Sequence, residues 1–271
     1  MTDYRLLDSV QPWIETHMGA ALSGVEEGAT SVLPMDPAIS SSPLIAVKAG
    51  EKAALAVRPE WVERIRAIAD DLHNDLLFST FGAYELARVT LPDNVGVWGP
   101  SWYLFADEQT WRPANDDRLV KLDPRELADV DFGTFWHCHP DCFAGFGVYD
   151  GKKLVALATV WDRGGPMWEV GMDVLQGAKL AGIGRAIVSA AVGWIIENGK
   201  IALASTASFN VPSARTLRSA GLRYVFSAMN GSEGFMRVPP QILGLPYPGA
   251  VVQDLYPGWA MSKDIQPRTM S

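Results

Sequence analysis

Two glycines and two cations stand where an apolar run begins, in the segment KLAGIGRAIV. Gly182 and Gly184 lie between Lys179 and Arg185, after an expected strand and at the start of an expected helix. A helix start presents unpaired N–H groups and the positive end of the helix dipole, and glycines let an anion approach that backbone closely. The pattern predicts a phosphate-binding turn, in which the two cations add charge-assisted hydrogen bonds.

Other phosphate-binding motifs differ from this segment in their spacing. A Walker A loop needs Gly-Lys followed by Ser or Thr, and this stretch does not contain that tripeptide. A dinucleotide-binding fingerprint needs a third glycine where Ile187 stands, and an acidic residue about twenty positions further on, where LASTASF offers none. The spacing excludes the first motif and disfavours the second.

A second block, NVPSARTLRSAGL, follows the next expected strand. Together the two blocks resemble the GNAT superfamily of acyl-coenzyme A dependent N-acyltransferases. That family carries Arg or Gln, two residues, Gly, one residue, and Gly or Ala at a helix start, then an Asn-x-x-Ser or Ala block ending in Gly-Phe. Lys replaces Arg or Gln here, and Leu replaces Phe. The matching residues, within roughly 119–230, are Lys179, Gly182, Gly184, Asn210, Ser213, Leu217, Gly221 and Leu222.

The resemblance implies acetyl-coenzyme A as the acyl donor, with its pyrophosphate on the turn and its pantetheine arm along the end of the preceding strand. A backbone N–H, that of Val174 or Leu175, would stabilise the tetrahedral oxyanion by roughly 3–4 kcal/mol. The residues expected to bind coenzyme A are Val174, Leu175, Gln176, Lys179, Leu180, Ala181, Gly182, Ile183, Gly184, Arg185, Asn210 and Ser213.

Two carboxylates on the preceding strand are candidates for the base that deprotonates the acceptor amine. Glu169 is the first candidate and Asp173 the second, and alternation places both on the strand face that carries Gly171. The alternative is that Glu169 is only a solvated or hydrogen-bonded strand residue. Many members of the family carry a Tyr general acid just after the leucine of the second block, where this chain has Arg218. The general acid therefore stays unassigned.

The segment HCHPDC gathers two histidines and both cysteines of the chain. Its spacing fits no common zinc pattern, and His17 and His73 stand alone in the sequence, so no metal site is predicted. The segment instead reads as a loop that enters a strand at Phe143 and lines the acceptor pocket. Because no export signal is visible, Cys138 and Cys142 are expected to be reduced thiols.

Composition narrows the classes of partner. The formal charge of −8 disfavours nucleic acid, and it modestly favours a cationic acceptor. The longest apolar stretch, 183–196, is too short to span a bilayer, so no membrane partner is expected. We expect a cytoplasmic enzyme. Its oligomeric state stays open, with a homodimer as one option.

Periodicity and turn residues predict the elements that position these groups. An amphipathic helix is expected over 59–72 and a second near 80–88, and VWGPSWYLFAD reads as strand, turn, strand. From residue 119 the expected order is strand, helix, three strands, helix, strand, helix, strand. The hairpin among them turns at Asp150-Gly151, and the last two helices cover 184–198 and 212–220.

This order predicts an α+β fold, a GNAT-like mixed sheet flanked by helices, with an additional N-terminal α/β region. Residues 1–118 are expected to cover or shape the acceptor site, 119–238 to form the acyltransferase domain, and 239–271 to form a docked, proline-rich tail. The expected reaction transfers an acetyl or other short acyl group to the primary amine of a small molecule. Two alternatives stay open: a carrier-protein thioester or aminoacyl-tRNA as donor, and a non-catalytic acyl-coenzyme A binding or sensing module.

Overall fold

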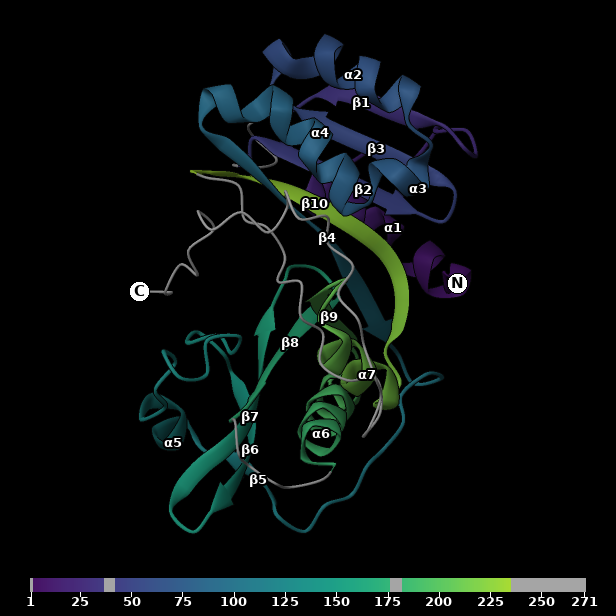
Figure 1. The fold of residues 1–271 in the computed structure, drawn as a ribbon. Helices are drawn as coiled ribbons and strands as arrows, with labels where there is room; N and C mark the ends of the chain where they lie inside the picture. The colour runs from purple at the N-terminus through teal and green to yellow at the C-terminus, as the bar shows by residue number, and fades with distance from the viewer. Residues whose placement is uncertain (1, 37–41, 176–181, 235–271) are drawn as a thin grey trace, which may run out of the picture. The chain divides into compact units, whose positions relative to one another are not determined.

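The computed structural model describes residues 2–36, 42–175 and 182–234 of the chain (Figure 1). The helices are α1 Tyr4–Met18, α2 Val62–Asp71, α3 Asn74–Leu77, α4 Thr80–Thr90, α5 Pro124–Ala128, α6 Ile183–Glu197 and α7 Val211–Ser219, with 3-10 turns η1 Pro59–Trp61 and η2 Leu91–Asp93. The strands are β1 Thr30–Pro34, β2 Leu44–Ala49, β3 Lys52–Val57, β4 Val95–Ala106, β5 Leu119–Leu122, β6 Ala144–Asp150, β7 Lys153–Asp162, β8 Met167–Val174, β9 Ile201–Ala207 and β10 Arg223–Glu233.

The ten strands of the described ranges form one sheet in the order β1-β3-β2-β10-β4-β9-β8-β7-β6-β5. Two neighbouring pairs, β1 with β3 and β8 with β9, are parallel, and the others are antiparallel. The expected class, a mixed sheet flanked by helices, is confirmed. Strands from before and after residue 119 alternate in the middle of the sheet, so the N-terminal region extends the same sheet.

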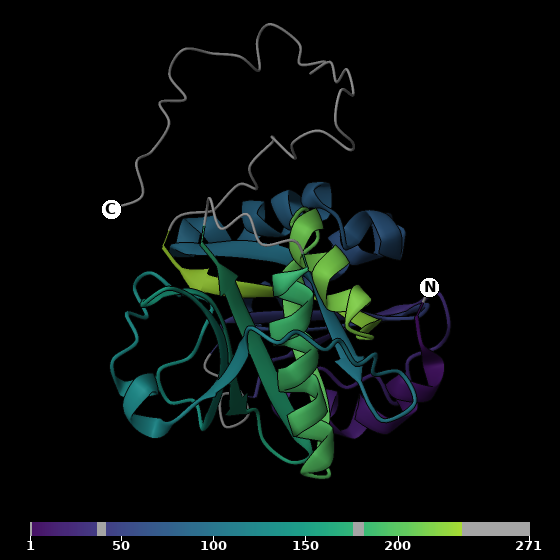
Figure 2. The ribbon, with the colours of Figure 1, turned by 90° about the horizontal axis from the view of Figure 1, so that it is seen from below.

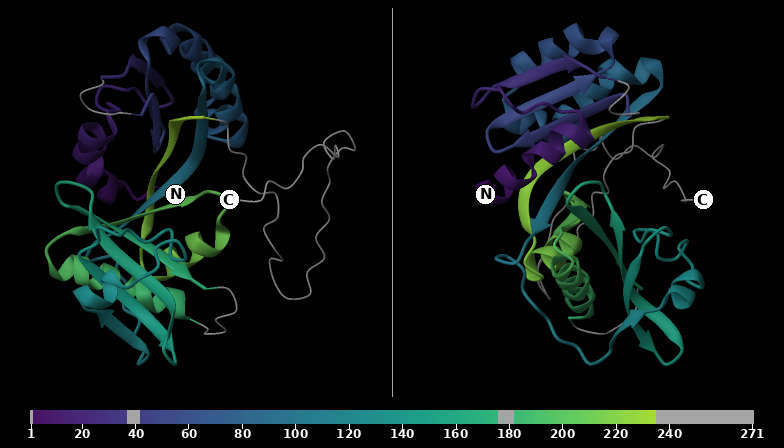
Figure 3. Two further views of the ribbon diagram at one scale, coloured as in Figure 1. Left: turned by 90° about the vertical axis from the view of Figure 1, so that its left-hand side faces the viewer. Right: turned by 180° about the vertical axis from the view of Figure 1, so that it is seen from behind.

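Helices cover both faces of the sheet. Alternate residues of β2 divide between two layers, since Ile45 packs with α1 and Ala46 with α2 and α4. In β4, Tyr103 packs on the α1 side and Leu104 on the α6 side. α6 lies beside α7 and against β6, β7 and β8 (Figure 2), and α1 crosses β10 on the opposite face (Figure 3).

Local signals account for the elements after residue 119. Asp123 caps α5 in a capping box with Glu126, and the Asn210 side chain caps α7. Gly199 and Gly221, with φ of 68° and 104°, follow the ends of α6 and α7. The expected order of elements in this part is confirmed. Among the described residues, no helix is both long and apolar enough to cross a lipid bilayer.

The structure differs from the sequence expectation before residue 119. The expectation of two strands in VWGPSWYLFAD was wrong, because β4 runs through Gly99-Pro100 and keeps pairing with β10 across a register shift. An irregularity of this kind absorbs an extra residue without ending the strand. The first fifty residues, which carry only a weak pattern, contain α1, β1 and β2. The expected docked tail, 239–271, lies outside the described residues.

Pairing between β8 and β9 stops part of the way along both strands. The parallel pairs run from Met167 with Ile201 to Glu169 with Leu203, yet β8 continues to Val174 and β9 to Ala207. Beyond that point β8 stays paired with β7 and β9 with β4. The two middle strands therefore diverge, and each keeps its outer neighbour.

Gly193 on α6 provides a first test of the packing. A Cβ at Gly193 would lie 2.5 Å from Cζ2 of Trp111, whose indole N–H donates to the Ser189 carbonyl at 3.0 Å. Gly193→Ala should therefore lower the free energy of unfolding by about 1–3 kcal/mol despite the higher helix propensity of Ala. Urea denaturation measures this change. The loss should shrink in a Trp111→Leu background, and a stabilised Gly193→Ala variant would contradict the contact.

Candidate functional site

Glu169 lies at the point where β8 and β9 diverge, because its pair with Leu203 is the last between them. Its side chain faces Ser205, two residues further along β9, whose hydroxyl donates to Oε1 at 3.2 Å. The other carboxylate oxygen pairs with Nε of Arg163 at 3.0 Å. A buried carboxylate with two polar partners thus occupies the fork between the strands.

Burial controls the protonation of this carboxyl group. Glu169 is 8% exposed, and this burial raises its pKa above that of an exposed glutamate, while the charge of Arg163 and the hydrogen bond from Ser205 lower it in part. The pKa of the buried Tyr103 hydroxyl is likewise raised, first by burial and then by the charge of Glu169. A carboxylate with a raised pKa is suited to accept a proton near neutral pH.

Helix α1 holds the turn that carries Arg163. The indole N–H of Trp13 donates to the Arg163 carbonyl at 3.0 Å, and the His17 ring lies against Gly164. Gly164 has a φ of 87°, and a Cβ there would lie 2.4 Å from Nε2 of His17, so only glycine fits beside the helix. The N-terminal helix therefore positions the cation that pairs with Glu169.

Asp173, the second candidate base, contacts His137 through both of its carboxylate oxygens. Its Oδ2 accepts the backbone N–H of His137 at 2.8 Å, and its Oδ1 lies 2.5 Å from Nδ1 of the same residue. The carboxylate thereby fixes the HCHPDC segment over β8. Gly171 lies beneath this segment, since a Cβ there would lie 1.9 Å from the His137 carbonyl.

The histidines and cysteines of this segment do not converge. His139 accepts from the Asp141 N–H and stacks on Trp161 at 5.2 Å, away from the contact between His137 and Asp173. Cys138 is buried, and burial raises the pKa of its thiol to about 12. In the described ranges, no three His, Cys, Asp or Glu side chains are grouped as metal ligands. The segment instead packs on β7 and β8, through the His139 N–H that donates to the Thr159 hydroxyl and through the contact between His137 and Asp173.

The predicted coenzyme A turn is only partly within the described residues. Gln176, Lys179, Leu180 and Ala181 lie outside them. Gly182 has a φ of 82° and precedes α6, and among the described residues no side chain caps the helix there and no atom lies within 4 Å of where its Cβ would point.

Gly184 has a different environment. A Cβ there would lie 3.3 Å from Cγ2 of Thr216 on α7, next to Met172 and Val174. This glycine therefore brings the start of α6 close to α7 and to the end of β8. Arg185 reaches the Pro113 carbonyl at 3.5 Å, and Ile183 is buried in the core.

The backbone N–H groups at the end of β8 and the cap of α7 bear on the remaining predicted residues. Leu175 donates its N–H to the Val155 carbonyl at 2.9 Å, so it cannot also stabilise an oxyanion in the fork. Alternation along the strand turns the N–H of Val174 to the opposite side, towards β9. On α7, the Asn210 side chain accepts the Ser213 N–H at 3.2 Å. Of the two predicted donors, only Val174 has its N–H directed into the fork, and Asn210 and Ser213 form a helix cap.

Sequence reasoning missed two residues of this cluster. Arg163 stands in the turn DRGGP directly before β8 and pairs with Glu169. The signal available in the sequence was a cation in the turn that precedes the strand of Glu169. Tyr103 comes from β4, and only the pairing of Tyr103 with Ser205 brings it close. Tyr224 shares a hydrogen bond of 2.9 Å with Ser227, and it lies on β10, which β4 and β9 separate from β8.

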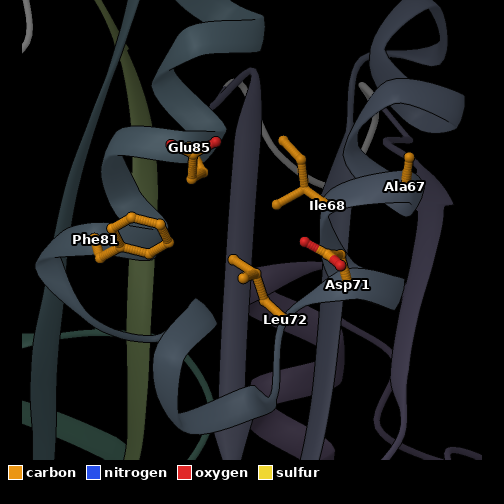
Figure 4. A pocket seen from close by; sticks show the side chains of 6 residues that line it. All are labelled: Ala67, Ile68, Asp71, Leu72, Phe81 and Glu85. Carbon is orange, nitrogen blue, oxygen red and sulfur yellow. The ribbon is translucent and has the colours of Figure 1, made fainter.

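A separate groove between α2 and α4 offers different chemistry. It has a volume of about 440 Å³ and is lined by apolar side chains with two carboxylates, Asp71 and Glu85 (Figure 4). Neither carboxylate has a nucleophilic side chain beside it among the lining residues. The groove therefore lacks the paired polar groups that the fork contains.

The ion pair between Arg163 and Glu169 predicts a pH-dependent loss of stability. Because the folded pKa of Glu169 is raised, its ionisation makes folding less favourable as the pH rises through that pKa. Arg163→Gln removes the compensating cation, and it should cost about 1–2 kcal/mol at pH 8 and much less at pH 4. The Arg163 side chain is 43% exposed, so the cost is below that of a fully buried pair.

Denaturant unfolding at both pH values measures the effect. The double variant Arg163→Gln, Glu169→Gln is the control. It has no carboxyl group at position 169, so the cost of removing Arg163 should no longer differ between pH 4 and pH 8. An equal loss at pH 4 and pH 8 in the single variant would show that the guanidinium does not compensate for Glu169.

No protein-family model and no curated protein matches this sequence. Solved structures match it in fold. A GNAT-family acetyltransferase from Colwellia psychrerythraea is 13% identical, with 84% of this chain and 97% of that chain covered and a TM-score of 0.43. A GCN5-related N-acetyltransferase-like protein from Streptococcus suis is 12% identical, with the same coverage and a TM-score of 0.45. A GNAT-family structure from Novosphingobium aromaticivorans is 16% identical, with a TM-score of 0.43, over 51% of this chain and 66% of that chain. In fold, the chain is similar to these GNAT-family structures.

Proposed function

We propose that this protein is an N-acyltransferase that moves an acetyl or other short acyl group from coenzyme A to the primary amine of a small molecule. The observation that carries the proposal is the fork between β8 and β9, with a buried carboxylate of raised pKa at its base. The resemblance of the two glycine blocks to the GNAT superfamily agrees with this arrangement.

Two features of the fork support binding of the thioester. Beyond Glu169, the β9-facing N–H and C=O groups of β8 have no strand partner among the described residues, so a pantetheine amide can pair with them. At the start of α6, the described residues leave open space beside Gly182 and place no side-chain cap on the first-turn N–H groups. A diphosphate fits such a helix start by charge and by hydrogen bonding.

The chemistry then needs a base and an oxyanion donor. An ammonium group has no lone pair, so Glu169 would take a proton from the acceptor, directly or through water, before the nitrogen attacks the thioester carbonyl. The tetrahedral intermediate places negative charge on the carbonyl oxygen, and the Val174 N–H would donate to it. Collapse of the intermediate forms the amide bond and breaks the carbon–sulfur bond, and the thiolate of coenzyme A leaves.

Donor binding is tested at Gly182, because its Cβ direction is open. Gly182→Asp should weaken acetyl-coenzyme A binding about tenfold or more, since the carboxylate would repel the diphosphate at the helix start. Gly182→Asn is the matched control, with nearly the same size, no charge and tolerance of positive φ. Isothermal titration calorimetry measures both. Unchanged binding in Gly182→Asp would place the diphosphate elsewhere.

Catalysis is tested at the two carboxylates of β8. Glu169→Gln should lower the rate of thiol release by about 100- to 10,000-fold and leave acetyl-coenzyme A binding unchanged. In the unsubstituted enzyme, the acidic limb of kcat/KM should lie above the ordinary pKa of glutamate, and the variant should lack it. The assay is a thiol-release screen across amines, amino acids and aminoglycosides.

Asp173→Asn separates the two candidate bases in the same assay. It should reduce activity less than Glu169→Gln, because Asp173 holds His137 and does not accept the proton. A larger loss in Asp173→Asn would transfer the role of base to Asp173. Binding of acetyl-coenzyme A with no thiol release in any arm would indicate the binding or sensing module instead of an enzyme.

A further inference from the structure

A hollow with a different character lies beside α7. It has a volume of about 810 Å³ and is formed by the start of α1, β4 and the turn after it, the last turn of α7 and the start of β10. α6 and α7 follow the parallel strands β8 and β9, so both helices begin at the same end of the sheet. Arg218 is seven residues past the first residue of α7, roughly 10 Å along its axis. The lining of the hollow includes no residue of the start of α6, although Thr216, two residues before Arg218, lies against Gly184.

Positive charge is concentrated in this hollow. Three arginines, Arg5, Arg218 and Arg223, line it against a single acid, Asp3. The Asp3 carboxylate accepts the Leu6 N–H at 3.1 Å, as the cap of α1. The whole chain has a net charge of −8, so this local cluster runs against the general field of the protein.

Only one of the three guanidinium groups is compensated. Arg5 forms an ion pair with Asp107, and its Nη2 donates to Oδ1 at 3.2 Å. Within the described part of the chain, the guanidinium groups of Arg218 and Arg223 have no hydrogen-bond or ion-pair partner. Two uncompensated guanidinium groups that face one hollow attract an anion, and each offers a planar fork of donors that matches a carboxylate or phosphate.

Aromatic rings form the wall next to these cations. Trp102 and Tyr224 meet edge to face, with ring centroids 6.2 Å apart at an angle of 76°, and both line the hollow. Leu104, which also lines it, is 0% exposed and belongs to the core. A planar ring placed on this wall would gain apolar contact while its charged group remains beside the arginines.

We propose that this hollow binds a small organic anion that carries a planar ring. The carboxylate or phosphate of the ligand lies between Arg218 and Arg223, and its ring lies against Trp102 and Tyr224. None of the lining residues belongs to the fork or to the start of α6, and Arg218 stands where the GNAT resemblance expects a Tyr general acid.

The test titrates the full chain at low ionic strength with three probes, phenyl phosphate, benzoate and inorganic phosphate, by isothermal titration calorimetry. Phenyl phosphate or benzoate should bind, and the tighter of the two identifies the charged group. Arg218→Gln together with Arg223→Gln should weaken that binding at least about tenfold, as the loss of two charge-assisted contacts requires. Arg215→Gln is the matched control, because Arg215 is exposed on α7 and does not line the hollow.

Four outcomes would overturn the proposal. They are failure of both ring probes to bind at millimolar concentration, equal binding in the double variant, equal weakening in Arg215→Gln, and inorganic phosphate binding as tightly as phenyl phosphate. If the double variant does not fold, Arg218→Gln alone serves, because Arg218 is exposed. Gly182→Asp should leave probe binding unchanged, so a failure of the proposed acyl transfer is distinguishable from a failure of this site.

Discussion

Pairing between β8 and β9 ends at Glu169 and Leu203, and the rest of the site depends on the separation of the two strands beyond that pair. Two parallel strands that part inside a sheet leave backbone N–H and C=O groups unpaired on both sides, which is unfavourable unless something else binds them. The sheet tolerates the gap because β7 holds β8 and β4 holds β9. The divergence thus exposes main-chain groups of Val174 without loosening the strands that carry them.

The carboxylate at the base of this gap is maintained by parts of the chain far apart in sequence. Arg163 supplies the charge, and Trp13 and His17 on α1 hold the turn in which Arg163 stands. A buried Glu169 without that cation would be neutral or would destabilise the fold. The N-terminal helix consequently affects the electrostatics of the site without contributing a reacting group.

The sequence predicts some parts of this arrangement and not others, for a physical reason. Elements with a local signal were predictable: Asp123 caps α5, glycines end α6 and α7, and alternation places Glu169 on a shared strand face. Non-local pairing decides the rest. The Gly99-Pro100 dipeptide reads as a turn, yet the neighbours of β4 keep it a single strand, and the proximity of Tyr103 to Glu169 depends on which strands meet.

The position of β10 has a consequence for biosynthesis. β10 is the last strand along the described chain, and it lies between β2 and β4, two strands made long before it. While the ribosome makes the intervening residues, for on the order of ten seconds, β2 and β4 each present an unsatisfied edge. Such late insertion implies a high contact order and slow maturation, and it exposes the nascent chain to aggregation until Glu233 has emerged.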